Sequence, residues 1–270
     1  MKRFFLSVVL ILTMISCAMI ISNKDNMYDN NLINVNKNYM DLNKIYNSLY
    51  LVKTVTKFKY VTDEKKKEFG TEDIVTIGIT VALNDKTLLT VDHIVTEYKL
   101  TFETPFGIIS IPADKLEEKS YLLLDGKEYL LNRLFNEGNI DVALLGVVGD
   151  LRLNSYPYKI GNSDDLEIGN FVYVFGNPLS WGINLRSGII SSLDLHKDVA
   201  KIADVNEKNA FVINAGLIPG DSGGVAIAIR DGEFELVGLL QGTHAGFNNM
   251  SWVIKINVIM DAINDYYSSV

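Results

Sequence analysis

A serine in the segment PGDSGG has the surroundings of a nucleophile. Ser222 stands between Asp221 and two glycines, and the apolar run VAIAI follows directly. Glycine reaches positive φ values and lets another chain approach closely, so the segment predicts a tight turn that exposes and fixes the hydroxyl. A serine hydroxyl is a weak nucleophile at neutral pH. This chemistry therefore requires a base, and an acid that orients the base, elsewhere in the chain.

The base and the acid have one good candidate each. Only three histidines occur, and His93 follows the apolar run TLLTV directly, which places it where a strand ends. Asp141 enters the apolar run VALLGV, where a partly buried carboxylate needs a donor such as an imidazole N–H. The order along the chain is His, Asp, Ser. That order excludes an esterase of the α/β-hydrolase class, which has the order Ser, Asp, His and a helix after the serine.

The elements that must hold these residues are short strands. From residue 74 onwards, β-rich runs alternate with turn signals such as Asp-Gly and Asn-Asp, in two sets of about six. This pattern predicts an all-β fold of two six-stranded antiparallel barrels, over roughly 71–155 and 156–255, with a short C-terminal helix. The absence of alternating strands and helices argues against a nucleotide-binding sheet.

The N-terminal part of the chain reads as a leader and a tether. Residues 1–22 combine two basic residues with a long apolar run, which is typical of an export signal or a membrane anchor. The only cysteine, Cys17, ends a stretch similar to a bacterial lipoprotein signal, where it would carry the lipid. Lipoprotein, uncleaved anchor and secreted protein all stay open. Residues 23–70 are polar and predict a tether containing a short amphipathic helix over 41–53.

Composition narrows the class of partner. The chain has 270 residues, is 48% hydrophobic and carries a net charge of −8, so it suits a globular protein and not one that neutralises nucleic-acid phosphates. No cysteine follows the leader, so no disulfide supports the fold. All three forms of the leader place the remainder outside the cytoplasm, in the periplasm or at the cell surface, with the membrane contacted only through the N-terminus.

Three blocks carry a resemblance to a known family. LLTVDHIV, NIDVALLGV and PGDSGG resemble the active-site blocks of the chymotrypsin-like (trypsin-like) serine peptidases, and most closely those of the HtrA/Deg branch. The segments GNP and SGIIS, and the closing WVIKINVIMDAI, support that branch. The match covers roughly residues 70–265. It implies an exported endopeptidase that acts on polypeptides, on unfolded or exported proteins in particular, without a metal or cofactor.

The resemblance also implies a role for each residue. Ser222 would attack the peptide carbonyl, His93 would take and return its proton, and Asp141 would orient His93. Backbone N–H groups of Gly220 and Ser222, with that of Asp221, would form the oxyanion hole.

A specificity pocket is implied beside the nucleophile. Its expected lining residues are Gly216, Leu239, Leu240, Thr243 and His244. The leucines and the threonine would suit a small or medium apolar side chain, and Gly216 brings no charge that would favour arginine or lysine. A related glutamyl-endopeptidase branch uses a histidine near the place of His244, which leaves acidic specificity as an alternative.

The chain departs from the HtrA pattern in three ways. Asp221 stands where that branch usually has asparagine. In digestive relatives an aspartate there pairs with a new N-terminal amine after cleavage, so activation by cleavage is an alternative. Only a few residues follow the expected last helix, so no PDZ domain is expected. Relatives often form trimers through N-terminal segments, a role that residues 41–60 could serve.

A second class of function competes with peptide hydrolysis. A protease fold that has lost activity could serve as a binding or adhesion module. The presence of all three triad residue types together with the glycines of the turn favours the enzyme.

Overall fold

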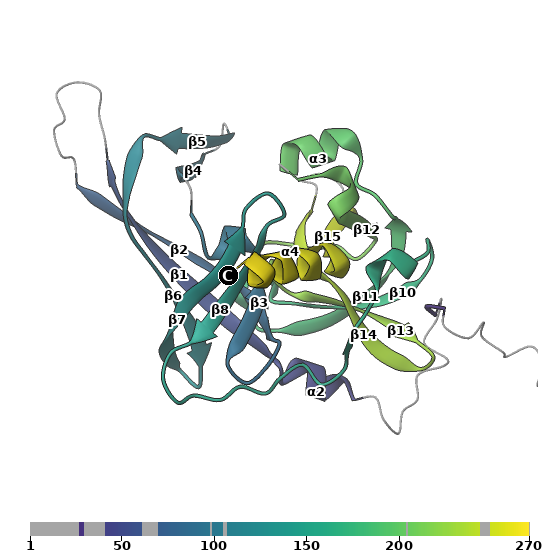
Figure 1. Ribbon diagram of the computed structural model, residues 1–270. Helices are drawn as coiled ribbons and strands as arrows, with labels where there is room; N and C mark the ends of the chain where they lie inside the picture. The colour runs from purple at the N-terminus through teal and green to yellow at the C-terminus, as the bar shows by residue number, and fades with distance from the viewer. Residues whose placement is uncertain are drawn as a thin grey trace, which may run out of the picture.

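Two β-barrels stand side by side in the computed structural model (Figure 1). The structure describes residues 27–29, 41–60, 70–97, 99–104, 107–203, 205–243 and 249–269. It confirms the predicted all-β fold with two closed, six-stranded antiparallel barrels and a C-terminal helix.

The first barrel is closed in the order β1-β2-β3-β8-β7-β6. Its strands are β1 (Leu49–Tyr60), β2 (Thr71–Ala82), β3 (Thr87–Thr90), β6 (Ala113–Leu124), β7 (Lys127–Glu137) and β8 (Val142–Val147). A separate hairpin of β4 (Leu100–Thr104) and β5 (Gly107–Ile111) lies between β3 and β6 in the chain. The 3₁₀ turn η2 (Asp92–Ile94) follows β3 and carries the candidate base.

The second barrel is closed in the order β13-β10-β11-β12-β15-β14, with β13 and β14 paired. Its strands are β10 (Phe171–Gly176), β11 (Asn184–Ser192), β12 (Ala210–Ile213), β13 (Val225–Arg230), β14 (Glu233–Thr243) and β15 (Ser251–Lys255). The short β9 (Lys159–Ile160) pairs in parallel with β14. Three 3₁₀ turns and one helix lie in its connections: η3 (Ser163–Asp165), η4 (Pro178–Ser180), η5 (Glu207–Asn209) and α3 (Lys197–Ala203).

One hydrophobic core crosses the seam between the barrels. Ile79 and Leu89 of the first barrel belong to the same buried cluster as Val225 and Leu239 of the second. The helix α4 (Ile256–Ser269) adds three buried isoleucines at helical spacing, as its sequence predicts. It crosses between the barrels in Figure 1. Its Tyr266 ring packs at a tilt against that of Phe135 of β7, with ring centroids 5.0 Å apart. The seam is therefore a packed interior.

The tether predicted over residues 23–70 is wrong for its second half. Residues 49–60 are β1, which pairs with β2 along its whole length and belongs to the first barrel. The predicted helix over 41–53 is only α2 (Leu42–Tyr46), capped by Asp41. Val52, assigned to the helix by its spacing, instead points into the barrel. Strand pairing outweighs the weak helical periodicity because a helix this short is marginal without tertiary support.

The leader lies outside the described residues, and so does Cys17. Within the described ranges no helix combines the length and apolarity that a membrane span requires. The part of the tether that is described, residues 27–29, lies on the second barrel, where the backbone of Asp29 bonds to Ile229 and Phe171.

Candidate active site

His93 and Asp141 meet at the end of the first barrel. The backbone N–H of His93 donates to Asp141 Oδ1 at 2.8 Å, and the ring Nδ1 lies 2.7 Å from Oδ2. A carboxylate only accepts hydrogen bonds, so Nδ1 carries the proton and Nε2 of the neutral ring is left able to accept one. Asp141 reaches both groups from a turn before β8 with φ +58°, a value that aspartate tolerates better than most residues.

The charge of Asp141 raises the pKa of the His93 imidazole. Burial disfavours the charged ring and lowers the pKa of His93, but the hydrogen bond and negative charge of Asp141 raise it by more, with smaller contributions from Asp92 and Glu97. The pKa of His93 therefore lies above its ordinary value of 6.5. The His93 side chain keeps 43% of its surface exposed while that of Asp141 keeps 10%, so the ring is reachable and its partner is sheltered.

A second network fixes the chain that follows His93. The Glu97 N–H donates to Glu118 Oε2 at 2.8 Å, and Arg133 donates both to the carbonyl of Val95 and to Glu118 Oε1. Side chains of strands β6 and β7 thus hold the backbone of the segment that follows η2. This attachment restricts the backbone from which the imidazole projects.

The turn around Ser222 comes from the second barrel but is bonded to the first. The N–H of Ile79 in β2 donates to the carbonyl of Ser222 at 2.9 Å. Gly78 makes this approach possible, because a Cβ there would overlap the Ile94 side chain and lie 2.9 Å from the Ser222 carbonyl oxygen. Since Ile94 follows His93 directly, the nucleophile turn and the histidine turn lie against the same glycine.

The turn itself is held by short-range hydrogen bonds. The N–H of Asp221 donates to the carbonyl of Ile218 at 3.1 Å, and the Ile218 N–H donates to Asp221 Oδ2 at 2.8 Å. Gly220 has φ +99°, and a Cβ there would overlap the carbonyl of Asn177. Among the described residues, the N–H groups of Gly220 and Ser222 have no protein acceptor, whereas that of Asp221 is already engaged.

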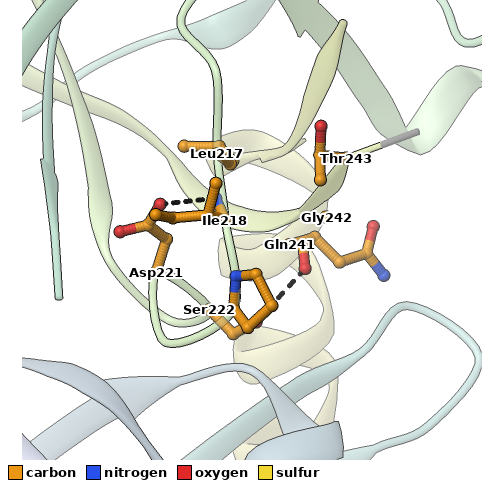
Figure 2. Close-up of a pocket in the computed structure, with 8 residues that line it drawn as sticks. Leu217, Ile218, Asp221, Ser222, Gln241, Gly242 and Thr243 are labelled. Atoms are coloured by element: carbon orange, nitrogen blue, oxygen red, sulfur yellow. Dashed lines mark hydrogen bonds between the residues drawn. The ribbon is translucent and has the colours of Figure 1, made fainter. Parts of the chain in front are cut away.

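Gln241, which the sequence analysis did not select, links Asp141 to Ser222. Its side-chain Nε2 donates to Asp141 Oδ2 at 2.9 Å, and its carbonyl accepts a long bond of 3.4 Å from the Ser222 hydroxyl. Within the described residues, no hydrogen bond joins Ser222 to His93. Figure 2 shows the Ser222 bond and the Gln241 side chain extending away from the pocket. The available signal was one polar residue ending the apolar run LVGLL of β14.

A pocket of about 180 Å³ opens beside Ser222. Figure 2 shows its lining residues, which come from the turn before the nucleophile and from the end of β14: Leu217, Ile218, Pro219, Asp221, Ser222, Gln241, Gly242 and Thr243. Beneath it, the Ser251 hydroxyl donates to Thr243 Oγ1 at 3.2 Å and accepts from the Leu217 N–H at 2.9 Å. The walls are mostly apolar, with hydroxyls at one side.

The predicted lining of this pocket needs correction. Thr243 lines it as expected, but Leu239 and Leu240 are fully buried in the core. Both faces of β14 are covered there, so alternation along the strand does not bring either leucine to the surface. Gly216 also stands outside the lining, and its carbonyl accepts from Arg186. His244 lies outside the described residues.

The comparison with protein families decides the classification. The family described as a trypsin-like peptidase domain matches residues 77–239, more than half of the chain. The chain belongs to this family. The match contains His93, Asp141 and Ser222 together with the Ile79 contact to the nucleophile turn. It also contains most of the pocket-forming segment.

Curated relatives of this peptidase domain are bacterial HtrA and DegP-like proteins. A serine protease HtrA-like protein of Staphylococcus haemolyticus is 31% identical over 201 residues, covering 67% of this chain and 30% of the relative. A probable periplasmic serine endoprotease DegP-like protein of Halomonas elongata is 30% identical over 164 residues, covering 57% of this chain and 32% of the relative. The chain thus spans only about a third of the length of these relatives.

Solved structures give the same fold. The HtrA-type protease AlgW with tripeptide matches at a TM-score of 0.55 and 17% identity, covering 83% of this chain and 61% of that chain. AlgW with decapeptide matches at a TM-score of 0.56 and 17% identity, covering 84% and 67%. At these identities the likeness shows the trypsin-like fold alone.

Other residues that could do chemistry stand apart from the site. His196 is exposed, and its ring lies near the exposed Asp198. The two tryptophans differ: Trp252 is buried against Gly242, but Trp181 is 83% exposed. Within the described ranges no group of three or more metal-binding side chains comes together.

Proposed function

We propose that this trypsin-like peptidase domain is a serine endopeptidase with His93, Asp141 and Ser222 as its triad. The Ser222 oxygen attacks the carbonyl carbon of a peptide bond while His93 Nε2 takes the hydroxyl proton. His93 then gives that proton to the leaving amine as the C–N bond breaks. His93 next takes a proton from water, whose oxygen attacks the acyl carbon, and returns that proton to the Ser222 oxygen as its bond to the acyl group breaks.

The observation that carries the proposal is how the two barrels are joined at the site. Asp141 holds both the backbone and the ring of His93, and the carbonyl of Ser222 accepts a hydrogen bond from Ile79 of the same barrel. The proposed base, acid and nucleophile are thereby all held against the first barrel. Such preorganisation supports a covalent mechanism, since positioned groups contribute much of the rate enhancement.

The Ser222 hydroxyl must turn towards His93 when substrate binds. Its bond to the Gln241 carbonyl is long, at 3.4 Å, and costs little to give up. Catalytic hydrogen bonds are often long in enzymes without substrate and tighten in the complex. In that complex the N–H groups of Gly220 and Ser222 would bind the developing oxyanion. Asp221 is left out because its N–H is engaged.

The pocket supports a preference for small or medium apolar side chains before the scissile bond. Leu217, Ile218 and Thr243 supply apolar walls and a hydroxyl. The one carboxylate beside the pocket, that of Asp221, lies 2.7 Å from Arg186 Nη2 and so attracts no basic side chain. Acidic specificity through His244 is the alternative.

The cellular setting is proposed from the leader and from the relatives. Several relatives are named periplasmic endoproteases, and the apolar run in residues 4–22 suits export. We place the domain outside the cytoplasm, attached to the membrane through the leader or a lipid on Cys17. There it would act on unfolded or exported polypeptides. A trimer like those of HtrA relatives is part of the same proposal.

A peptide library incubated with the full chain tests activity and specificity together. We expect cleavage after small or medium apolar residues, and complete loss of cleavage in Ser222→Ala with an unchanged circular dichroism spectrum. Cleavage only after glutamate would favour the His244 alternative. Turnover by Ser222→Ala near that of the unaltered chain would refute the assignment, and a folded chain with no cleavage at all would favour the binding module.

A further inference from the structure

A carboxylate is buried beside the nucleophile. The side chain of Asp221 keeps only 2% of its surface exposed. Its Oδ2 accepts from the Ile218 N–H at 2.8 Å, and its Oδ1 lies 2.7 Å from Nη2 of Arg186. Burying an ionised carboxylate is costly unless a cation or several donors compensate the charge. Among the ion pairs of the described residues, Arg186 is the only cationic partner of Asp221.

Arg186 also holds the chain some residues earlier. It lies in β11 and sends its second guanidinium nitrogen, Nη1, to the carbonyl of Gly216 at 2.6 Å. One guanidinium therefore contacts both ends of the segment from Gly216 to Asp221. That segment forms a wall of the pocket and leads directly into Ser222. A planar guanidinium presents several donors in a fixed geometry, which suits such a bridge better than an ammonium does.

The neighbouring strand leaves room for this pair. A side chain at Gly176, in β10, would overlap both Asp221 Oδ1 and Arg186 Nη2. The carboxylate is therefore enclosed by backbone, by Arg186 and by its own turn. If the positive charge were lost, the carboxylate would have to leave this enclosure or draw in water, and either movement would displace Gly220 and Ser222.

We infer that Arg186 is a positioning residue. Its positive charge, supplied from within the chain, keeps the segment from Gly216 to Ser222, with its proposed oxyanion N–H groups, in its working shape. The inference rests on the proposed endopeptidase function and adds a residue to it. Because Asp221 is already compensated, the turn needs no amine from a newly cut N-terminus. The chain is then active with residues 24–73 intact. The described part of the N-terminal region fits this reading, since Tyr28 bonds to Glu235 and Asn162 of the second barrel and not to Asp221.

Arg186→Gln in the full chain tests the inference against the unaltered chain. Loss of one oxyanion donor lowers kcat by about 10²- to 10³-fold, so a displaced turn predicts a fall of at least about 10²-fold, with a smaller change in KM. The double variant Arg186→Gln with Asp221→Asn removes the buried charge together with its partner. It should regain at least about tenfold in kcat over the single variant, because a neutral pair leaves no uncompensated charge. A purely structural role for Arg186 predicts no such recovery in kcat per folded molecule.

Matched controls separate the possible failures. Arg152→Gln removes an arginine whose ion pair with Asp85 is exposed, and should leave kcat unchanged. If Arg186→Gln does not fold, Arg186→Lys keeps the charge but not the two-point bridge, and should fold with a kcat about tenfold low. The mass of the active species reports whether residues 24–73 are present.

Three results would overturn the inference while leaving the endopeptidase standing. They are a kcat within twofold of normal in folded Arg186→Gln (or in Arg186→Lys if the glutamine variant does not fold), no recovery in the double variant, and activity that appears only after cleavage within residues 24–73. No hydrolysis by the unaltered chain would instead overturn the proposed function, and this inference with it.

Discussion

In the proposed mechanism, the two barrels contribute different kinds of chemistry to the seam. The first barrel provides side chains: His93 and Asp141 project from turns at its end and bind each other at two points. The second barrel provides a backbone shape, the turn of Gly220 and Ser222 with its N–H groups. A side chain can be fixed by one good partner, whereas a turn must be held along its length. This explains why the second barrel carries the pair of Arg186 with the buried Asp221, whereas in the first barrel Asp141 contacts His93 directly.

The burial of the strands follows the same division. In β1 and in the outer half of β2, side chains alternate between the barrel interior and a partly exposed face. In contrast, β12 and β13 are buried on both faces. The end of β2 that contacts Ser222 is also buried throughout, and the Ser222 turn of the second barrel lies against it. The seam is thus the most enclosed part of the first barrel, where a small displacement reaches the active site.

The largest fall in kcat should come from a change in the His93–Asp141 pair of the first barrel. Asp141→Asn keeps the backbone conformation, since asparagine also tolerates a positive φ, but it can no longer hold the imidazolium. We expect kcat to fall by about 10⁴-fold at neutral pH, as in the analogous triad. Asp85→Asn, an exposed change in the same barrel, is the control. A loss below tenfold would mean that another group orients His93.

The joint between the barrels should be the next most sensitive point. Gly78→Ala places a methyl group against Ile94 and the Ser222 carbonyl, both of which bound the site. Misplacement of reacting groups by about 1 Å can cost about 10²-fold, and we expect a loss of that order in kcat. Gly146→Ala, whose methyl group meets only the Leu134 side chain, should leave kcat unchanged. Equal kcat values in Gly78→Ala and Gly146→Ala would contradict the close packing of the two barrels at Gly78.

The pH dependence of kcat/KM should test the link that Gln241 makes between the barrels. His93 must be neutral to act as base and its pKa lies above 6.5, so kcat/KM should rise with pH through a limb above that value. Gln241→Leu removes a donor from Asp141, which then holds the imidazolium more strongly, so the limb should move to higher pH. Loss of one hydrogen bond predicts a fall of about fivefold in kcat/KM at pH 7. A limb that stays in place, or moves to lower pH, would show that Gln241 does not act through Asp141.

The smallest effect on activity should come from the far side of the second barrel. Tyr28→Phe removes a buried bond of 2.8 Å to Glu235, which should lower the free energy of unfolding by about 1 to 3 kcal/mol. Its kcat per folded molecule should not change. Urea unfolding and turnover, measured on the same samples, test the expected loss of stability and the expected unchanged kcat. A fall in kcat without a loss of stability would mean that the N-terminal segment reaches the active site.

The sequence was enough to predict the class of the fold and to select the candidate residues His93, Asp141 and Ser222, whose catalytic roles stay a prediction. His93 and Asp141 stand at the junction of an apolar strand and a turn, and Ser222 stands among glycines, so each could be found from its immediate neighbours. The isoleucines of α4 follow a helical period that the structure keeps. These features are local, and each of them was strong enough to be read from its own segment of the chain.

What escaped prediction depends on contacts between distant segments. The inward face of β1 carries Thr54 and Thr56 between Val52 and Phe58, and these threonines bond to Ser120 and Glu118. The polar pair interrupts the apolar alternation that would have identified a strand. Leu239 and Leu240 look like pocket residues until both faces of their strand are found covered. Arg186 and Gln241 each acquire a role only when another strand brings Asp221 or Asp141 within reach.

Covalent labelling of Ser222 by a fluorophosphonate tests most directly whether residues of the two barrels act together. The account predicts a single adduct, on Ser222, in the folded full chain, and a labelling rate that collapses in His93→Ala although the nucleophile turn is untouched. An unlabelled Ser222 in the folded chain, or an equal rate with and without the imidazole, would contradict it.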